Sequence, residues 1–157
     1  MKLDLIQLYI EYHIETTRRV WSLIDSITEE QFLADETYSQ GSIRNLMVHL
    51  TSVDRRWLAG LKNQEDVGHL RQEDYSTRAA AREAFENVAK DLSDYVSTLT
   101  EEVLNKPTDK VEQPQWQILL HLVNHGTDHR ATVLQRLNEI GVKTFPQDLV
   151  IWLWERK

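Results

Sequence analysis

Residues 115–140, QWQILLHLVNHGTDHRATVLQRLNEI, form the segment that decides the fold. The pattern predicts one long helix, and Gly141 directly after it is a typical C-terminal signal. The helix has one apolar stripe and a second stripe that carries three histidines. Because a helix with apolar residues around much of its girth is buried on more than one side, this segment belongs inside a helical bundle. The apolar stripe consists of Trp116, Leu119, Val123, Leu134 and Leu137, and the second of Ile118, His121, His125, His129 and Thr132.

Three more segments carry the helical period, at residues 3–27, 42–63 and 77–100. Their apolar residues recur at helical spacings, which predicts amphipathic helices. The second of them starts near Ser42, and Thr28 with Gln31 fits a capping box that opens a short turn. The apolar stripes are Ile6, Ile10, Ile14, Trp21, Ile24 and Ile27; Ile43, Leu46, Leu50, Val53, Trp57 and Leu61; and Ala81, Phe85, Val88, Leu92, Tyr95 and Leu99.

The segments between these helices are short and polar. We expect loops at residues 64–76 and 103–114. Residues 145–154, FPQDLVIWLW, contain Asp148 as a plausible cap, so we expect a short helix or an extended segment that packs across the bundle. The predicted fold class is therefore all-α: a bundle of four long antiparallel helices with a short C-terminal helix and no substantial sheet. We expect a single domain over residues 1–157.

Composition and charge exclude several classes of function. The chain has no cysteine, which rules out disulfides, cysteine-bound zinc and thiol nucleophiles supplied by the protein. A net charge of −7 repels phosphate backbones, and the pair Arg55 and Arg56 is too small a basic patch to offset it, so we expect no nucleic-acid partner. No apolar run approaches the roughly 18 to 20 residues of a membrane span. Asp4, Glu11 and Glu15 interrupt the apolar pattern at the N-terminus, which argues against a signal peptide and favours a cytoplasmic protein.

His125 and His129 are the first candidate metal ligands. They are four residues apart, so both imidazoles project from one face of the predicted helix. One helix supplies two nitrogen ligands in this way in the zinc-protease motif HExxH. Gly126 follows His125 here, so the glutamate that serves as general base in those proteases is missing. The spacing therefore indicates a metal site but not a metalloprotease.

His49 is the candidate third ligand, because two histidines on one helix bind a metal only weakly. It lies mid-helix beside Leu46 and Val53, where an imidazole without a partner is costly. Three histidines with an open position are the pattern of a catalytic metal centre. The alternative is that these residues are hydrogen-bonded core histidines and that HxxxH arises by chance among six histidines. Spacing alone leaves both interpretations open.

The chain resembles the DinB/YfiT-like family in three stretches. Residues 42–50, SIRNLMVHL, with Trp57 eight residues after His49, are similar to the signature of the family's second helix. Residues 119–130, LLHLVNHGTDHR, are similar to its second signature, and residues 145–153, FPQDLVIWL, to its C-terminal segment. The resemblance covers nearly the whole chain in the right order.

This resemblance implies a four-helix bundle with a long crossover connection, commonly a homodimer. It also implies one divalent metal ion, often nickel or zinc, bound by His49, His125 and His129. Many relatives have a histidine where this chain has Asp128, and Gly-Gln where it has Ala131-Thr132. These departures leave the three ligands intact and concern neighbours that control substrate choice. The family name refers to induction after DNA damage, which does not imply DNA binding.

Several other polar residues are weaker candidates. His121 lies one turn before His125, and we expect it to contact a ligand or simply to pack, because a fourth protein ligand would close the site. Trp57 belongs to the core or lines the pocket, and Asp128, next to His129, either supports the ligands or lines the pocket, or is simply a solvated acid. The remaining assignments are His13 as a core or rim histidine, His69 as a solvated loop residue, and Arg44 and Arg130 as surface arginines that attract an anionic substrate or have no specific role.

Two classes of function fit this sequence. The first is a metal-dependent enzyme, in which a small thiol cosubstrate (an S-transferase) or a metal-activated water (a hydrolase) attacks a small electrophile held against an apolar wall. Some relatives use bacillithiol, mycothiol or glutathione-like thiols, and a chain without cysteine needs such a cosubstrate. The second is a non-catalytic, metal-binding bundle of the stress response. An open fourth coordination position favours the enzyme, and a fourth protein ligand or a sealed core favours the binding bundle.

Overall fold

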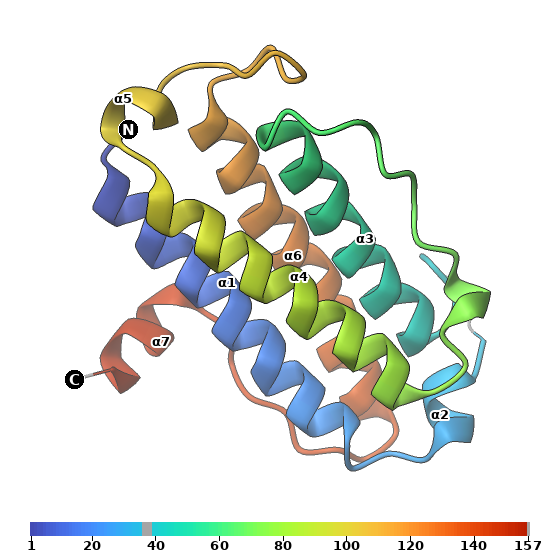
Figure 1. Cartoon of the computed structure of the whole chain (residues 1–157). Coiled ribbons are helices and arrows are strands. Elements are labelled where there is room, and N and C mark those ends of the chain that lie inside the picture. The colour runs from blue at the N-terminus through green and yellow to red at the C-terminus, as the bar shows by residue number, and fades with distance from the viewer. Residues whose placement is uncertain (36–38, 157) are drawn as a thin grey trace.

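The computed structural model describes residues 1–35 and 39–156, and the regular structure of these residues is entirely helical (Figure 1). Four long helices form a bundle, which confirms the predicted all-α fold class. They are α1 (Leu3–Ile24), α3 (Ile43–Leu61), α4 (Arg78–Thr98) and α6 (Gln115–Glu139). The shorter elements are α2 (Glu29–Leu33), the 3-10 turn η1 (Gln72–Asp74), α5 (Glu101–Leu104) and α7 (Leu149–Glu155).

Polar caps set where the helices begin. The Ser42 hydroxyl accepts a hydrogen bond from the Asn45 amide at the start of α3, and Thr77 caps α4 in the same way. Thr28 and Gln31 form the predicted capping box at α2. Such caps satisfy amides that have no partner within the helix. The end of α6 also agrees with the sequence, because Gly141 follows it with φ of +88°, in the left-handed region that favours glycine.

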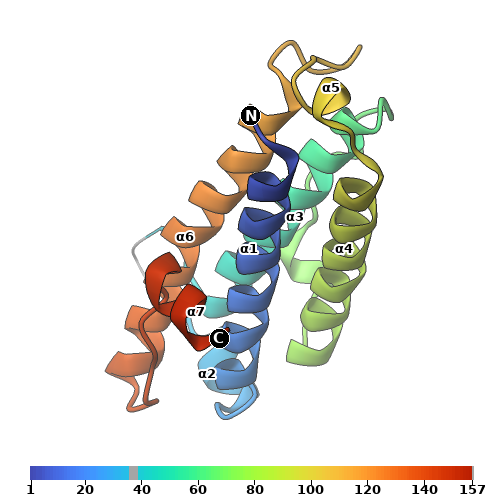
Figure 2. The same ribbon diagram turned by 90° about the vertical axis from the view of Figure 1, so that its left-hand side faces the viewer.

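The direction of the helices follows from one long connection. Helices α1 and α6 run in one direction and α3 and α4 in the other (Figures 1 and 2). The connection from α3 to α4, residues 62–77, returns along the whole bundle, as the resemblance implied. The antiparallel arrangement expected from sequence therefore holds for α3 with α6 and for α1 with α4. The neighbours α1 and α6, and likewise α3 and α4, are parallel.

The other differences from the predicted elements are small. Helix α1 ends at Ile24 rather than Ile27, and η1 and α5 add short turns within or next to the predicted loops. The C-terminal segment forms α7, which lies across α1 (Figure 2). Trp152 anchors it there by donating a hydrogen bond to Glu15 and packing edge-on against Tyr12. Asp148 precedes α7, but its side chain forms no capping bond.

The core fills the space between the four long helices. Its largest fully buried apolar side chains are Trp21, Phe32 and Phe85. The Trp21 ring of α1 packs against Phe32 of α2 and against Phe85 of α4. Within residues 1–35 and 39–156, no helix is long and apolar enough to cross a membrane. The core thus holds α3 and α6 side by side, and these are the helices that carry the candidate metal ligands.

Candidate metal centre

Three histidine side chains converge between α3 and α6. His49 comes from the middle of α3, and His125 and His129 come from successive turns of α6. The Nε2 atom of His125 lies 3.2 Å from that of His49 and 3.0 Å from that of His129. One ring nitrogen from each residue lies within 4.8 Å of the others, so the three histidines can hold a metal ion. The structure thus brings together the three ligands that the sequence singled out.

The surroundings of the cluster keep its imidazoles neutral. Burial is the largest cause that lowers the pKa of His49, and the nearby His129 and His69 add to it. Burial also lowers the pKa of His125 to about 3, helped by the neighbouring histidines, and it lowers the pKa of His129. A neutral imidazole is the form that donates a lone pair to a metal. The cluster is therefore in a metal-binding protonation state at neutral pH.

Protons alone cannot satisfy these nitrogens. A neutral imidazole nitrogen carries either one hydrogen or one lone pair, so a contact between two of them needs one donor and one acceptor. His125 Nε2 makes two such contacts, at 3.2 and 3.0 Å, and a single lone pair or hydrogen serves only one of them well. Two nitrogens bound to one ion at about 2.0–2.1 Å lie at most about 4.2 Å apart, and both distances meet that limit. A shared cation fits where a shared proton does not.

The opposite nitrogens of two of these rings are buried. Among the described residues, the Nδ1 atoms of His125 and His129 have no hydrogen-bond partner. If Nε2 faces the cluster with its lone pair, Nδ1 carries the hydrogen and lacks an acceptor. A buried donor of that kind costs about 1–3 kcal/mol. This cost is the same with or without a bound ion, so the case for a metal rests on the three Nε2 atoms.

Within the described residues, no fourth side chain joins this cluster as a potential ligand. His121 is exposed, and its ring lies 5.8 Å from the His125 ring and 5.7 Å edge-on from the Trp57 ring, centre to centre. Asp128 is exposed, as expected of a solvated acid, and its charge acts to raise the pKa of His129 against the effect of burial. The three histidines therefore leave room for a ligand from outside the protein.

Trp57, His69 and Arg44 each make defined contacts, and only His69 differs from its expected surroundings. Trp57 is half-buried, packs against the core and lines a cavity beside α3. His69 is exposed, yet its Nδ1 shares a hydrogen bond with Ser52 and its Nε2 accepts one from Arg56. It therefore fastens the crossover connection to α3 instead of standing free in solvent. Arg44 is half-buried and donates to the neighbouring Asn45 side chain.

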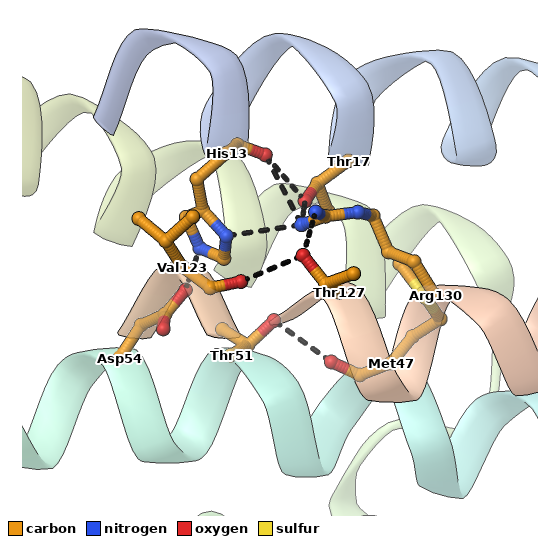
Figure 3. Close-up of polar contacts among 8 residues, drawn as sticks. All are labelled: His13, Thr17, Met47, Thr51, Asp54, Val123, Thr127 and Arg130. Atoms are coloured by element: carbon orange, nitrogen blue, oxygen red, sulfur yellow. Dashed lines mark hydrogen bonds and ion pairs between the residues drawn. The ribbon is translucent and has the colours of Figure 1, made fainter. Parts of the chain in front are cut away.

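Arg130 contradicts the sequence interpretation, which treated it as a surface residue. It is completely buried and links α6 to α1 through His13, also completely buried (Figure 3). The Arg130 Nη1 atom can only donate, so His13 Nδ1 accepts its hydrogen bond at 3.0 Å. The His13 Nε2 atom then carries the hydrogen and donates to Asp54 of α3 at 2.9 Å. These three residues form a buried network in which a neutral imidazole joins a cation to an anion.

Gly126 makes room for this network beside the candidate metal ligands. A Cβ atom at that position would lie 2.4 Å from the His13 ring and 2.8 Å from the Arg130 guanidinium. The sequence holds a signal that would have revealed the network. Between Val123 and Leu134, the apolar stripe of the helix continues through Gly126 and Arg130, which places that arginine on the core side.

Comparison with known proteins matches this chain over nearly its whole length. The DinB family profile matches residues 1–156. Protein DinB of Bacillus subtilis (strain 168) is 24% identical over 160 residues, an alignment that covers 94% of this chain and 92% of that protein. The similarity thus extends over both helices that carry the three histidines.

Proposed function

This chain belongs to the DinB family, and from that premise we propose that it is a metal-dependent enzyme with one divalent ion held by His49, His125 and His129. The observation that carries the proposal is the meeting of three Nε2 atoms, two of their contacts being 3.0 and 3.2 Å, where protons cannot satisfy every lone pair. Nickel and zinc are the proposed ions, because imidazole nitrogen suits both and the family resemblance favours them.

The protein's part in the reaction is to leave one side of the site open. Three neutral imidazoles cancel none of the charge of a divalent ion, so an anionic ligand is favoured at the remaining position. When bound, such an ion lowers the pKa of a thiol or a water and so yields a nucleophile at neutral pH. A small external thiol fits a chain without cysteine, which makes an S-transferase the first choice and a hydrolase the second.

The surrounding side chains position the reactants and do not transfer protons. No acidic side chain of the described residues belongs to the cluster, so none is placed as a general base. His49 and His125 are only partly buried, so solvent reaches part of their side chains. The exposed His121 lies against His125 and against the half-buried Trp57, and the rings of His121 and Trp57 offer an aromatic wall to an incoming substrate.

The same lack of a general base favours a second candidate function. A bundle that binds metal without turnover, as a stress-response binding protein, needs the three histidines and nothing else. The open coordination side separates the two functions, since an enzyme exchanges a ligand there and a storage or structural site does not.

The test starts from protein purified without an affinity tag and without added metal. Elemental analysis should give one divalent ion per chain. Titration of the cobalt-substituted protein with bacillithiol-like, mycothiol-like and glutathione-like thiols should produce a thiolate-to-metal charge-transfer band with at least one of them, and His49→Ala should abolish the band. If every thiol is silent and no conjugating activity is found, the binding bundle replaces the enzyme.

We also propose that the protein is a homodimer. This rests on the family resemblance and is supported by the apolar side chains of α7 that remain exposed, Val150 at 48% and Trp154 at 62%. Exposed aromatic residues are enriched at protein interfaces. Light scattering at high concentration should give twice the mass of one chain, and a monomer there would reject the dimer.

A further inference from the structure

A cavity of about 380 Å³ lies beside the second half of α3, next to the edge of the core. It is enclosed by that helix, by the first part of the crossover connection and by the loop before α6. Val53, Trp57, Gly60 and Val111 form its apolar wall. The volume falls in the range of about 300–1,000 Å³ that is usual for small-molecule sites. The cavity is therefore large enough for a compact organic molecule.

The cavity continues the surface on which the metal centre lies. His49, Val53, Trp57 and Gly60 follow one another at spacings of four, four and three, which places them on one face of α3. With a rise of 1.5 Å per residue, Val53 begins the cavity roughly 6 Å along the helix from His49. The Trp57 ring meets His121 edge-on, and His121 in turn faces His125. A molecule in the cavity would thus have one end near the three histidines.

The charges in the cavity wall are already paired with one another. Arg56 binds Asp66 through two hydrogen bonds of 3.1 and 2.8 Å and donates a further one to His69. Lys110 forms an ion pair with Glu65 at 2.6 Å. The two positive and two negative charges cancel, so the wall carries no net charge to attract an anion or a cation. The wall therefore favours an apolar ligand over a charged one.

We propose that this cavity binds the apolar body of a small neutral molecule, with an aromatic or branched hydrocarbon group against Trp57. Its reactive end then faces the three histidines, and that orientation rests on the proposed function. The binding itself does not, since none of the three histidines lines the cavity. The chemical class is a neutral aryl or alkyl electrophile, which a metal-activated nucleophile would attack.

Two fluorescent probes with the same ring system test this class of ligand. N-phenyl-1-naphthylamine is neutral, and 1-anilinonaphthalene-8-sulfonate differs from it by one anionic group. The full chain should bind the neutral probe more tightly. Trp57→Ala should weaken that binding about tenfold, because the probe then has no aromatic ring to pack against and buries less apolar area. Trp154→Ala removes an exposed tryptophan from α7 and should leave binding unchanged.

A second variant guards against loss of fold in Trp57→Ala. Gln64 is exposed and lines the same cavity, so Gln64→Trp fills the space without removing a buried side chain. It should also weaken binding of the neutral probe, while circular dichroism stays unchanged. If neither Trp57→Ala nor Gln64→Trp affects binding of the neutral probe, the cavity is not its site and the proposal is overturned.

Two more variants test whether binding of the probes depends on charge or on the metal. Lys110→Gln should leave binding of the neutral probe unaffected. If the full chain instead binds the sulfonate more tightly than the neutral probe, and Lys110→Gln abolishes that binding, the cavity is a site for anions. His125→Ala should lose the metal and keep the probe, which separates failure of the metal proposal from failure of the cavity. Loss of the probe in folded His125→Ala protein would show that the cavity is not an independent site.

Discussion

His13 of α1 and His125 of α6 both lie next to Gly126, yet the hydrogen-bond partners of their rings differ. Every polar ring atom of His13 has a partner, since Nδ1 accepts from Arg130 and Nε2 donates to Asp54. At His125, Nε2 meets two other Nε2 atoms, and the buried Nδ1 has no partner among the described residues. The His13 ring has a suitable partner at each nitrogen, and the His125 ring does not.

The difference teaches how a buried histidine is assigned to structure or to metal binding. A structural histidine has a fixed tautomer because a donor and an acceptor hold it from both sides. A candidate ligand has a lone pair that points at other lone pairs, in a site that lowers its pKa. The sequence shows only that both are histidines within helices, so the partners decide the role.

The largest effect is expected from a variant that breaks the buried network of Arg130, His13 and Asp54. Asp54→Ala leaves Arg130 completely buried without its anion, and we expect a loss of about 3–5 kcal/mol in the free energy of unfolding. Urea denaturation in the presence of a chelator measures this. Glu86→Ala is the matched control, because it removes a carboxylate from an exposed pair with Arg18 and should cost at most about 1 kcal/mol. Equal losses in the two variants would contradict the structural role of the network.

The next largest effect is expected when the cluster of His49, His125 and His129 loses one histidine. His125→Ala should weaken metal binding by more than about a hundredfold, because loss of a ligand exceeds the 10–100-fold loss that follows removal of a supporting partner. Competition with a fluorescent chelator gives the affinity. In metal-free buffer the same variant should lose little stability, since it removes a buried nitrogen that has no partner.

His121→Ala is the control for this second variant. It removes a histidine that touches the His125 ring and does not belong to the candidate ligands, so metal affinity should stay within about twofold. His13→Ala and His69→Ala should likewise keep the metal, although His13→Ala should destabilise the fold. If His121→Ala loses the metal as His125→Ala does, the three-ligand assignment is wrong.

A smaller effect tests the glycine that lies between the two clusters. Alanine normally stabilises a helix by up to about 1 kcal/mol over glycine. At position 126 the alanine Cβ would lie 2.4 Å from the His13 ring, and overpacking of this kind costs about 1–3 kcal/mol. This cost outweighs the helix gain, so we expect Gly126→Ala to destabilise the protein. Thermal unfolding in chelator should show a lower Tm, and an unchanged or higher Tm would mean that the His13 ring can move aside.

The last effect is a gradual dependence of stability on pH, spread over several pH units. In the folded chain the pKa values of His49, His125 and His129 are lowered from 6.5, that of His125 to about 3. Below pH 6.5 the unfolded chain therefore binds protons that the folded chain does not. Metal-free stability should be complete above pH 6.5 and fall toward pH 3, by at most about 1.4 kcal/mol per pH unit for each histidine. Urea titrations at several pH values measure the slope, and His125→Ala should make it shallower.

Much of the fold was predictable because it depends on local patterns. The spacing of apolar residues gave the four long helices, and Ser42, Thr28 and Gly141 marked ends that the structure confirms. The directions of the helices were less accessible, since they depend on how far residues 62–77 travel and not on any periodicity. The meeting of His49 with His125 depends in turn on the packing of α3 against α6.

The buried network was missed for a physical reason. An arginine is almost always exposed unless it is paired, and its partners His13 and Asp54 lie far away in the sequence. Only the position of Arg130 within the apolar stripe of its helix pointed inward. The cavity on α3 was missed as well, because its wall combines one helix face with two loops whose paths no local pattern predicts.

His49 and His125 lie 76 residues apart in the chain, on either side of the crossover connection and α4. A metal bound by both closes a large loop, and a permanent link across a loop of that size would restrict the unfolded chain by about 4 kcal/mol at room temperature. Early in folding, only the pair His125 and His129 on a single helix is available, and it binds weakly. The ion would therefore bind late in folding, after the bundle has formed, and its main effect would be to slow unfolding.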